Sequence, residues 1–215
     1  SCHHEQASGF AAEGYGRITG KPGIALATSG PGATNLITAI GSCYFDSTPA
    51  LFICGQVNTH ELSTGKNIRQ LGFQETDIVN LTKSITKESI QLEKAEDLPE
   101  ILPYLFELTL SKRQGPCLLD IPMNLQSAMV GKENLKYFFN KKKLDFVFDD
   151  SLIKNKMNDL IQDIKNAKRP LLLFGGGCSA KKNRNITLKL LELLKFPAVC
   201  SLLGLDCISN DNNLK

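Results

Sequence analysis

The hydrophobic positions of the chain fall into short, wholly apolar runs, separated by longer segments in which apolar residues recur at helical spacing. The apolar runs predict buried strands, and the periodic segments between them predict helices. Strands that are apolar throughout and alternate with helices are typical of a parallel sheet covered on both faces. We therefore predict a doubly wound parallel α/β sheet, with helices at 5–18, 33–44 and 97–112, a short helix after residue 76, and strands at 24–27, 49–54, 84–89 and 117–121.

A second α/β unit follows a change of composition. Residues 129–150 are rich in Lys, Asn and Phe without a firm period, which indicates an interdomain connection. The pattern beyond them predicts further elements, a helix at 152–167, a strand at 170–174, a glycine turn, a helix at 183–194 and a strand at 198–202. We therefore expect a first domain at 1–128, a linker at 129–150, and the N-terminal part of a Rossmann-like domain at 151–215.

The composition of the 215 residues argues against several classes of protein. The net charge is only +3, and the single basic run, Lys141 to Lys143, adjoins acidic residues, so we expect no nucleic-acid partner. No apolar stretch reaches the roughly 18 residues of a membrane span, so we expect no membrane partner. Seven cysteines without a C-x-x-C pair favour reduced thiols and a cytoplasmic protein. The abrupt start and end of the chain suggest a piece of a longer polypeptide.

The first helix opens on a carboxylate, within the sequence His4-Glu5-Gln6. A glutamate in the first helical turn gains from the positive end of the helix, so a purely structural role is the default for Glu5. A metal site is not expected here, because adjacent helical residues point in different directions and no third ligand lies nearby in the sequence.

Two glycine-rich turns and one polar pair are further candidates. Residues 28–35 read TSGPGATN between a strand and a helix, which suits either a phosphate cradle or a tight structural turn. Gly175, Gly177 and Ala180 have the spacing of a weak dinucleotide fingerprint, without a ribose-binding acid at the expected distance. Phe73 and Gln74 end the long polar segment 57–76, and loops of that length are usually functional or disordered.

These motifs occur in an order that resembles the acetolactate synthase family of thiamine-diphosphate enzymes. The resemblance rests on HEQ, GYGR and TGKPG, then ATSGPGATNLIT, FDSTP, GQV, GFQETDIV and GPCLLDIPMN, which are similar to that family's pyrimidine-binding domain. The later RPLLLFGGG and FPAVCSLLG are similar to the start of its central domain. One departure stands out, because the segment between Gln56 and Gln74 is several residues longer than in typical acetolactate synthases.

The resemblance implies a role for each matching position. Glu5 would be the carboxylate that hydrogen-bonds the aminopyrimidine ring of thiamine diphosphate and activates it, with a pKa raised by an apolar pocket. Gln74 would act on the bound substrate and Phe73 would form an apolar wall beside it. The cofactor side of the sheet would be lined by Gly30, Pro31, Gly32 and Asn35.

The resemblance also implies partners and cofactors. The substrate would be a 2-keto acid, and the site would form between the subunits of a homodimer or tetramer, as in enzymes of branched-chain amino acid biosynthesis. Mg²⁺ would be bound by a C-terminal domain, with no metal ligand in this chain, and FAD is compatible with the family. Three functions stay open: a carboligase or decarboxylase, an inactive remnant or subunit-pairing module, and a nicotinamide dehydrogenase resting on Gly175 to Ala180 alone.

Overall fold

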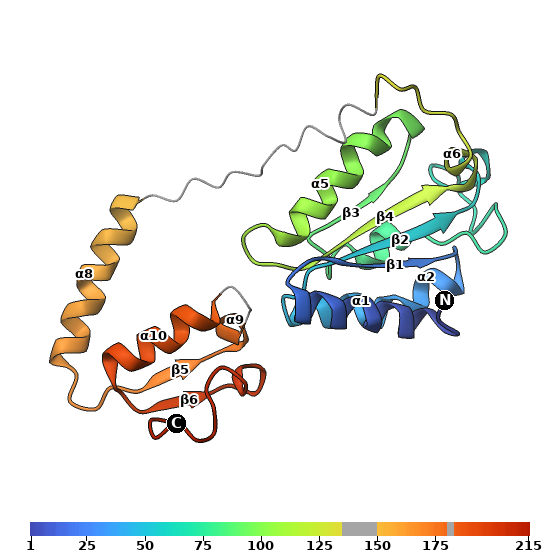
Figure 1. The fold of residues 1–215 in the computed structure, drawn as a ribbon. Helices are drawn as coiled ribbons and strands as arrows, with labels where there is room; N and C mark the ends of the chain where they lie inside the picture. Colours follow the sequence, from blue (N-terminus) through green and yellow to red (C-terminus); the bar gives the residue numbers. More distant parts are fainter. Residues whose placement is uncertain (135–149, 180–182) are drawn as a thin grey trace. The chain divides into compact units, whose positions relative to one another are not determined.

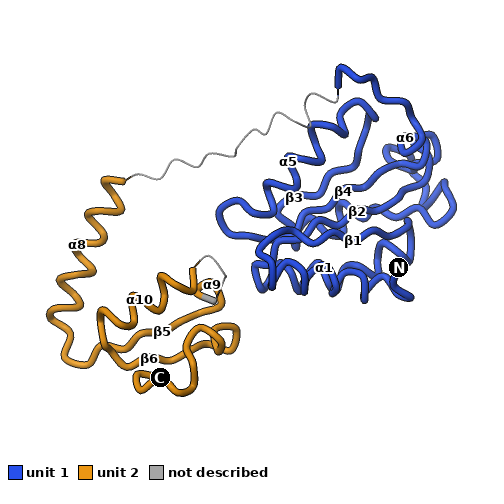
Figure 2. Tube along the Cα trace, in the orientation of Figure 1, with its two compact units in different colours: residues 1–144 blue, residues 145–215 orange. Residues whose placement is uncertain are grey.

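The computed structural model describes residues 1–134, 150–179 and 183–215. The chain divides into two compact units, residues 1–144 and 145–215 (Figure 2). The boundaries expected for the linker stay a prediction, because most of residues 129–150 lie outside the described part of the chain.

Unit 1 begins with helix α1 (Glu5–Thr19), whose two ends are closed by local hydrogen bonds. The side chain of His4 accepts a hydrogen bond from the backbone N–H of Gln6, which caps the first turn. Gly20 adopts a left-handed conformation at φ 69° and donates its N–H to the carbonyl of Gly16. The small residues Gly9, Ala12 and Gly16 are buried, so the helix packs close to the sheet.

The sheet of unit 1 has four parallel strands in the order β1-β2-β4-β3 (Figure 1). Its strands are β1 (Gly23–Ala27), β2 (Ala50–Gln56), β3 (Glu88–Gln91) and β4 (Pro116–Pro122). The register pairs Ala27 with Cys54, and Cys54 with Asp120. The carboxyl ends of the three strands therefore lie side by side, and the segments that leave them begin at one edge of the sheet.

Helices cover both faces of this sheet, as the apolar strands predict. Helices α1 and α3 (Ile37–Phe45) lie on one face and α5 (Leu98–Leu110) on the other (Figure 1). Phe52 and Leu118 are buried in the core on the first face, whereas Leu51 and Leu119 are buried in the core on the second. The doubly wound α/β fold is thus confirmed for unit 1.

The helix predicted at 33–44 is two helices, α2 (Pro31–Asn35) and α3. At the junction the N–H of Leu36 bonds the carbonyl of Ala33, three residues back, and this tightened turn separates the two helices. The structure also adds a short helix that was not predicted, α6 (Met123–Gln126), directly after β4.

The strand predicted at 84–89 is wrong in position, because β3 starts only at Glu88. Helix α4 (Ile78–Thr82) precedes it, and the chain stays turned beyond the helix. The hydroxyl of Thr86 donates to the carbonyl of Thr82 and also bonds the Ser89 hydroxyl. Such local side-chain bonds compete with strand pairing, and they direct the apolar Ile85 into the core below the helices.

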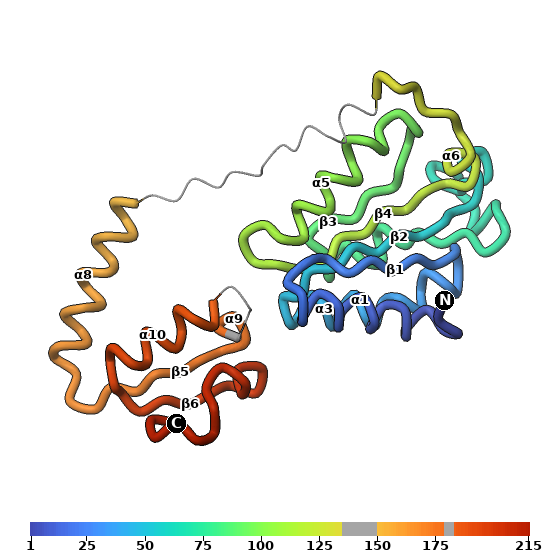
Figure 3. Tube along the Cα trace, in the orientation of Figure 1, coloured from blue at the N-terminus to red at the C-terminus, as the bar shows by residue number. Residues whose placement is uncertain are grey.

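Unit 2 contains a two-stranded parallel sheet of β5 (Leu172–Phe174) and β6 (Ala198–Cys200), with α8 (Asp150–Asn166), α9 (Gly176–Ser179) and α10 (Arg184–Leu194) (Figure 3). The predicted glycine turn after residue 174 leads directly into α9. A Cβ on Gly176 would lie 2.9 Å from Cβ of Leu203, so close packing against the following segment accounts for this glycine. Ala180 of the dinucleotide spacing lies outside the described residues.

The helices described in the two units include none with the length and apolar character that a membrane span requires.

Candidate functional site

The turn that follows β1 brings the predicted site residues together. Gly30 is the N-cap of α2 at φ 62° and ψ −128°, a conformation that residues with a side chain rarely adopt. Pro31 occupies the first turn of α2 and Asn35 is its last residue. A Cβ on Gly32 would lie 2.8 Å from Cγ2 of Thr28 and 3.5 Å from Oε1 of Glu5. The turn therefore holds the backbone close beside the carboxylate that opens α1.

Glu5 and Asn35 are joined across this turn. The side-chain amide of Asn35 donates a hydrogen bond of 3.0 Å to Oε2 of Glu5, linking residues 30 positions apart in the sequence. Glu5 itself is half-buried. The hydrogen bond from Asn35, joined by one from the backbone N–H of Glu5, holds the pKa of the carboxyl below its ordinary value, and burial opposes this only weakly. The expectation of a raised pKa is wrong for this chain, because an amide donor outweighs the weak desolvation.

Gln74 lies on the other side of the same turn. Its backbone is left-handed at φ 57°, and a Cβ on Gly30 would lie 2.7 Å from Cβ of Gln74. A side-chain-bearing residue held in this conformation costs roughly 1–3 kcal/mol, and such strain concentrates at functional sites. The neighbouring Phe73 is 82% exposed and contributes to the wall of a pocket. The turn thus lies between Gln74 and Glu5, with Gly30 against Gln74 and Gly32 near Glu5.

The segment 57–76 is ordered by carboxylates rather than by regular structure. Apart from a 3-10 turn, η1 (Thr59–Glu61), it contains no helix or strand. Oε1 of Glu75 accepts from the backbone N–H and the hydroxyl of Ser63 at 2.6 and 2.7 Å, and Oε2 accepts from the N–H of Leu71 at 3.0 Å. In addition, the Gly72 N–H donates to the carbonyl of Glu61. Together these bonds join the two ends of residues 62–71, so that this loop forms an excursion with a closed base.

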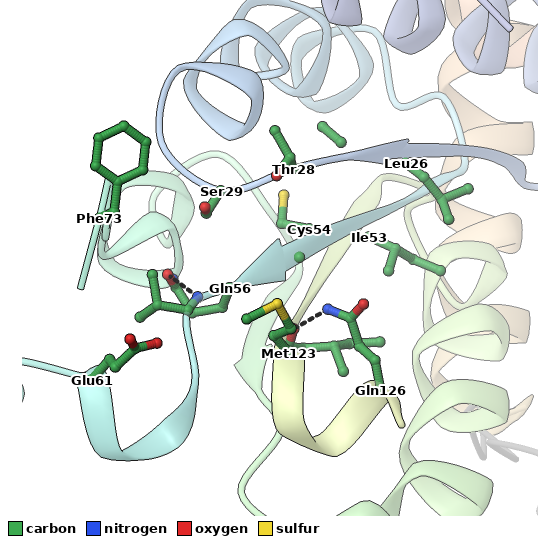
Figure 4. Close-up of a pocket in the computed structure, with 14 residues that line it drawn as sticks. Leu26, Thr28, Ser29, Ile53, Cys54, Gln56, Glu61, Phe73, Met123 and Gln126 are labelled. Carbon is green, nitrogen blue, oxygen red and sulfur yellow. Dashed lines mark hydrogen bonds between the residues drawn. The ribbon is translucent and has the colours of Figure 1, made fainter. Parts of the chain in front are cut away.

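A pocket of about 590 Å³ opens at the carboxyl ends of β1, β2 and β4 (Figure 4). Thr28, Ser29 and Phe73 lie on one side of it, and Met123 and Gln126 lie on the other. Its remaining walls are mainly apolar residues of the strands, with Gln56 and Glu61 as further polar groups. Thr28 belongs both to this pocket and to the surroundings of Gly32, so the pocket adjoins the turn beside Glu5. Ligands of open α/β sheets bind at this edge.

Sequence reasoning missed the pocket wall formed by α6 and a buried polar cluster beneath the pocket. Asp120 of β4 is fully buried, and its Oδ2 accepts from the amides of Gln56 and Gln91 at 3.0 and 2.9 Å. A signal was available, because an aspartate inside an otherwise apolar strand is rarely buried without a specific partner. Within the described ranges, His, Cys, Asp and Glu side chains form no group of three that could hold a metal ion.

A parallel sheet with a carboxylate, an amide and a pocket gathered at its carboxyl edge defines a small-molecule or cofactor-binding α/β domain. Two protein-family models match this chain and identify the class of domain. Residues 1–81 match the N-terminal binding domain of thiamine pyrophosphate enzymes, and residues 157–215 match the central domain of the same enzymes. The chain belongs to the thiamine pyrophosphate enzyme family.

The chain is also similar to individual proteins that are named acetolactate synthase. The chain is 36% identical over 210 residues to acetolactate synthase isozyme 2 large subunit of Escherichia coli, covering 98% of this chain and 36% of that protein. It is 36% identical over 213 residues to a probable acetolactate synthase large subunit of Methanococcus aeolicus, covering 98% and 34%. A chloroplastic acetolactate synthase of Arabidopsis thaliana is 36% identical over 214 residues, covering 98% and 30%. The chain spans about a third of the length of these relatives.

Proposed function

We propose that this chain is part of a thiamine-diphosphate-dependent carboligase or decarboxylase acting on a 2-keto acid, most like acetolactate synthase. The observation that carries the proposal is the hydrogen bond between Glu5 and Asn35 beside the turn of Gly30 and Gly32. It holds a carboxylate next to the pocket in the domain that matches the thiamine pyrophosphate family. Relatives named acetolactate synthase over 98% of the chain support the reaction class.

The residues of this turn fit the aminopyrimidine part of the cofactor. Glu5 offers a carboxylate that can hydrogen-bond a ring nitrogen, and Asn35 fixes the orientation of that carboxylate. The turn of Gly30, Pro31 and Gly32 can lie close to Glu5 and Thr28, because a Cβ at Gly32 would meet the Thr28 side chain. When bound, thiamine diphosphate supplies an electron sink for decarboxylation of a 2-keto acid.

Glu5 acts in this proposal by holding and exchanging a proton at one carboxylate oxygen. General acid–base catalysis works best when the pKa of the group lies near the operating pH. In the chain by itself the Asn35 amide lowers the pKa of Glu5. Covering the half-buried carboxylate by a second subunit would add desolvation, which raises the pKa of an acid and moves it towards that range.

Gln74 and Phe73 are assigned to the substrate. The amide of Gln74 can both donate and accept hydrogen bonds, which suits the carbonyl and carboxylate oxygens of a 2-keto acid. Phe73 presents an exposed ring to the pocket and would exclude water from the reacting carbonyl. The strained backbone of Gln74 supports a functional role for this position.

The remaining features of the assembly are proposed from the family. As the resemblance to the family implies, Mg²⁺ and the diphosphate would be held by a further domain, and FAD binding is compatible with the family. The site would form between subunits of a homodimer or tetramer. All seven cysteines are free thiols, which supports a reducing compartment such as the cytoplasm.

The test is Glu5→Gln in the complete polypeptide, assayed with pyruvate, thiamine diphosphate and Mg²⁺. We expect turnover to fall by roughly 10²- to 10⁴-fold, because the amide cannot exchange the proton. Glu96→Gln, which changes an exposed carboxylate of η2 (Ala95–Asp97), is the matched control and should retain full activity. Near wild-type turnover of Glu5→Gln would overturn the proposed role.

The alternative function is that of an inactive remnant or a subunit-pairing module of such an enzyme. Calorimetry of the 215-residue chain with thiamine diphosphate and Mg²⁺ separates the two. Tight binding by the chain without a partner contradicts the module. Absence of binding, followed by association with a complete subunit carrying Glu5→Gln that restores no activity, supports it.

A further inference from the structure

Asp120 is a fully buried acid at the centre of the sheet. It lies in β4, the third strand across, where its register partner is Cys54 of β2. The residues before and after it, Leu119 and Ile121, pack against the core below α5. A carboxyl group in such surroundings is costly unless it is neutral or fully hydrogen-bonded, so its partners indicate why it is there.

The two oxygens of Asp120 have different surroundings. Oδ2 accepts two amide N–H groups, from Gln56 at 3.0 Å and Gln91 at 2.9 Å. Oδ1 is buried and has no hydrogen-bond partner among the described residues. An ionised oxygen without a donor is more costly in an apolar interior than a neutral hydroxyl. This arrangement suits a carboxylic acid that carries its proton on Oδ1 and presents Oδ2 as a carbonyl-like acceptor.

The pKa of Asp120 agrees with this arrangement. Burial raises the pKa, the hydrogen bonds from Gln91 and Gln56 lower it by less, and the nearby Asp77 raises it further. A neutral acid also keeps the amide donors on Oδ2 without placing a charge beneath the pocket.

Gln56 connects this acid with the loop that carries Gln74. Its Nε2 donates both to Oδ2 of Asp120 and, at 2.7 Å, to the backbone carbonyl of Thr76. Its Oε1 accepts from the N–H of Val57 at 3.0 Å (Figure 4), and the three bonds together fix the amide in one orientation. Thr76 follows Gln74 by two residues, and its carbonyl also accepts from the N–H of Ile78, which opens α4.

We propose that Asp120 is a positioning residue for Gln74, acting through the Gln56 amide and the Thr76 carbonyl. The proposal rests on the substrate role of Gln74 under the proposed function. The cluster ties β2, β3 and β4 to the C-terminal end of segment 57–76, while Gly30 confines Gln74 from the other side. Gln74 is thereby fixed at both flanks, although its own side chain is exposed.

The test compares Asp120→Leu with Asp120→Asn in the complete polypeptide, by kcat, KM and thermal unfolding. Leucine removes the acceptor, so Gln56 loses its anchor, and we expect kcat to fall by about 10- to 100-fold. Asparagine keeps an acceptor oxygen and places its NH₂ where the proposed proton sits, so kcat should stay within about twofold of wild type. Thr109→Val, which removes a buried hydroxyl that bonds only within α5, controls for general loss of stability.

A double variant separates positioning from general damage. In a Gln74→Ala background, Asp120→Leu should lower kcat no further, because the residue that it positions is already gone. A loss that multiplies with that of Gln74→Ala would overturn the proposal. If Asp120→Leu fails to fold, Gln56→Met breaks the same connection and takes its place. Unchanged kcat in Asp120→Leu and Gln56→Met, beside an impaired Gln74→Ala, refutes the positioning role alone. Full activity of Gln74→Ala instead refutes the assignment of Gln74.

Discussion

Gly30 and Gln74 lie so close together that a side chain added at Gly30 would meet Gln74. A Cβ on Gly30 would lie 2.7 Å from Cβ of Gln74 and 2.9 Å from its carbonyl oxygen, and both residues have positive φ. The contact joins the turn after β1 to the end of segment 57–76. It places the proposed substrate residue beside the proposed cofactor turn.

Gly30→Ala should therefore lower stability and move Gln74. The added methyl group meets the backbone of Gln74, and alanine at φ 62° is strained, so we expect a loss of at least about 1–3 kcal/mol in urea unfolding. Gly14→Ala is the control, because Gly14 lies inside α1 with nothing within 4 Å of the added Cβ. That substitution should stabilise the chain by roughly 0.5–1 kcal/mol. Equal stability of the two variants would contradict the close contact.

Replacements of Gln74 should separate stability from activity. Gln74→Gly and Gln74→Ala remove the same amide, but only glycine relieves the left-handed backbone at φ 57°. We expect the glycine variant to be about 1 kcal/mol more stable than the alanine variant in urea unfolding. Both should lose turnover in the complete polypeptide. A glycine variant less stable than the alanine variant would show that the backbone at Gln74 is not strained.

Asn35→Leu should raise the pKa of Glu5. The Asn35 amide is the largest cause of the lowered pKa, and leucine removes it while keeping a similar volume. Because the folded-state pKa of wild-type Glu5 is lowered, the stabilisation from its carboxylate is present above the unfolded-state pKa and is lost as the pH falls through the folded-state pKa. A ¹³C NMR titration of the Glu5 carboxyl measures the shift directly. An unchanged titration midpoint would mean that Asn35 does not set the pKa.

Asp120→Asn should change how stability depends on pH. The folded-state pKa of Asp120 is raised, so the folded chain retains a proton that the unfolded chain releases. The resulting stabilisation is complete below the unfolded-state pKa of about 3.9 and is lost as the pH rises through the folded-state pKa. Asparagine cannot ionise, so the difference in unfolding free energy between Asp120→Asn and wild type should grow in favour of the variant across this range. A difference independent of pH would contradict the raised pKa.

Glu75→Ala should loosen the excursion over residues 62–71. The carboxylate bonds Ser63 at one end and Leu71 at the other, and alanine removes all three bonds. We expect faster trypsin cleavage after Lys66 and Arg69, because local opening exposes backbone to the protease. Glu96→Ala, at an exposed position on η2, should leave the cleavage rate unchanged. Equal rates for both variants would show that Glu75 does not close the excursion.

Most of the fold follows from the sequence pattern, because the central strands β2 and β4 are buried on both faces. The apolar runs at residues 24–27, 49–54 and 117–121 correspond to β1, β2 and β4 within two residues at each end. The pattern fails where side chains bond the backbone locally. Thr82 and Thr86 keep residues 83–87 turned, and periodicity does not register their hydroxyl bonds. The division of the predicted helix into α2 and α3 at Leu36 likewise depends on one tightened turn, which the hydrophobic pattern does not register.

The sequence predicts the members of the candidate site better than their interactions. The order of motifs selects Glu5, Asn35 and Gln74, and the structure places all three around the turn of residues 30–32. The direction of the Glu5 pKa shift could not be predicted, because it depends on an amide 30 residues away. Nor could the connection from Asp120 through Gln56, since it requires the register of β2 with β4.

The closed base of residues 62–71 has a consequence for how far this segment can change in length. The Gly72 N–H bonds the Glu61 carbonyl, so the chain leaves and re-enters the domain at nearly one point. Adding residues to a loop whose ends are already joined costs little entropy, about 0.6 kcal/mol for each doubling of length. Insertions and replacements here can therefore accumulate without unfolding the sheet. The turn beside Glu5 lacks this freedom, because an added Cβ at Gly30 or Gly32 would meet a neighbouring residue.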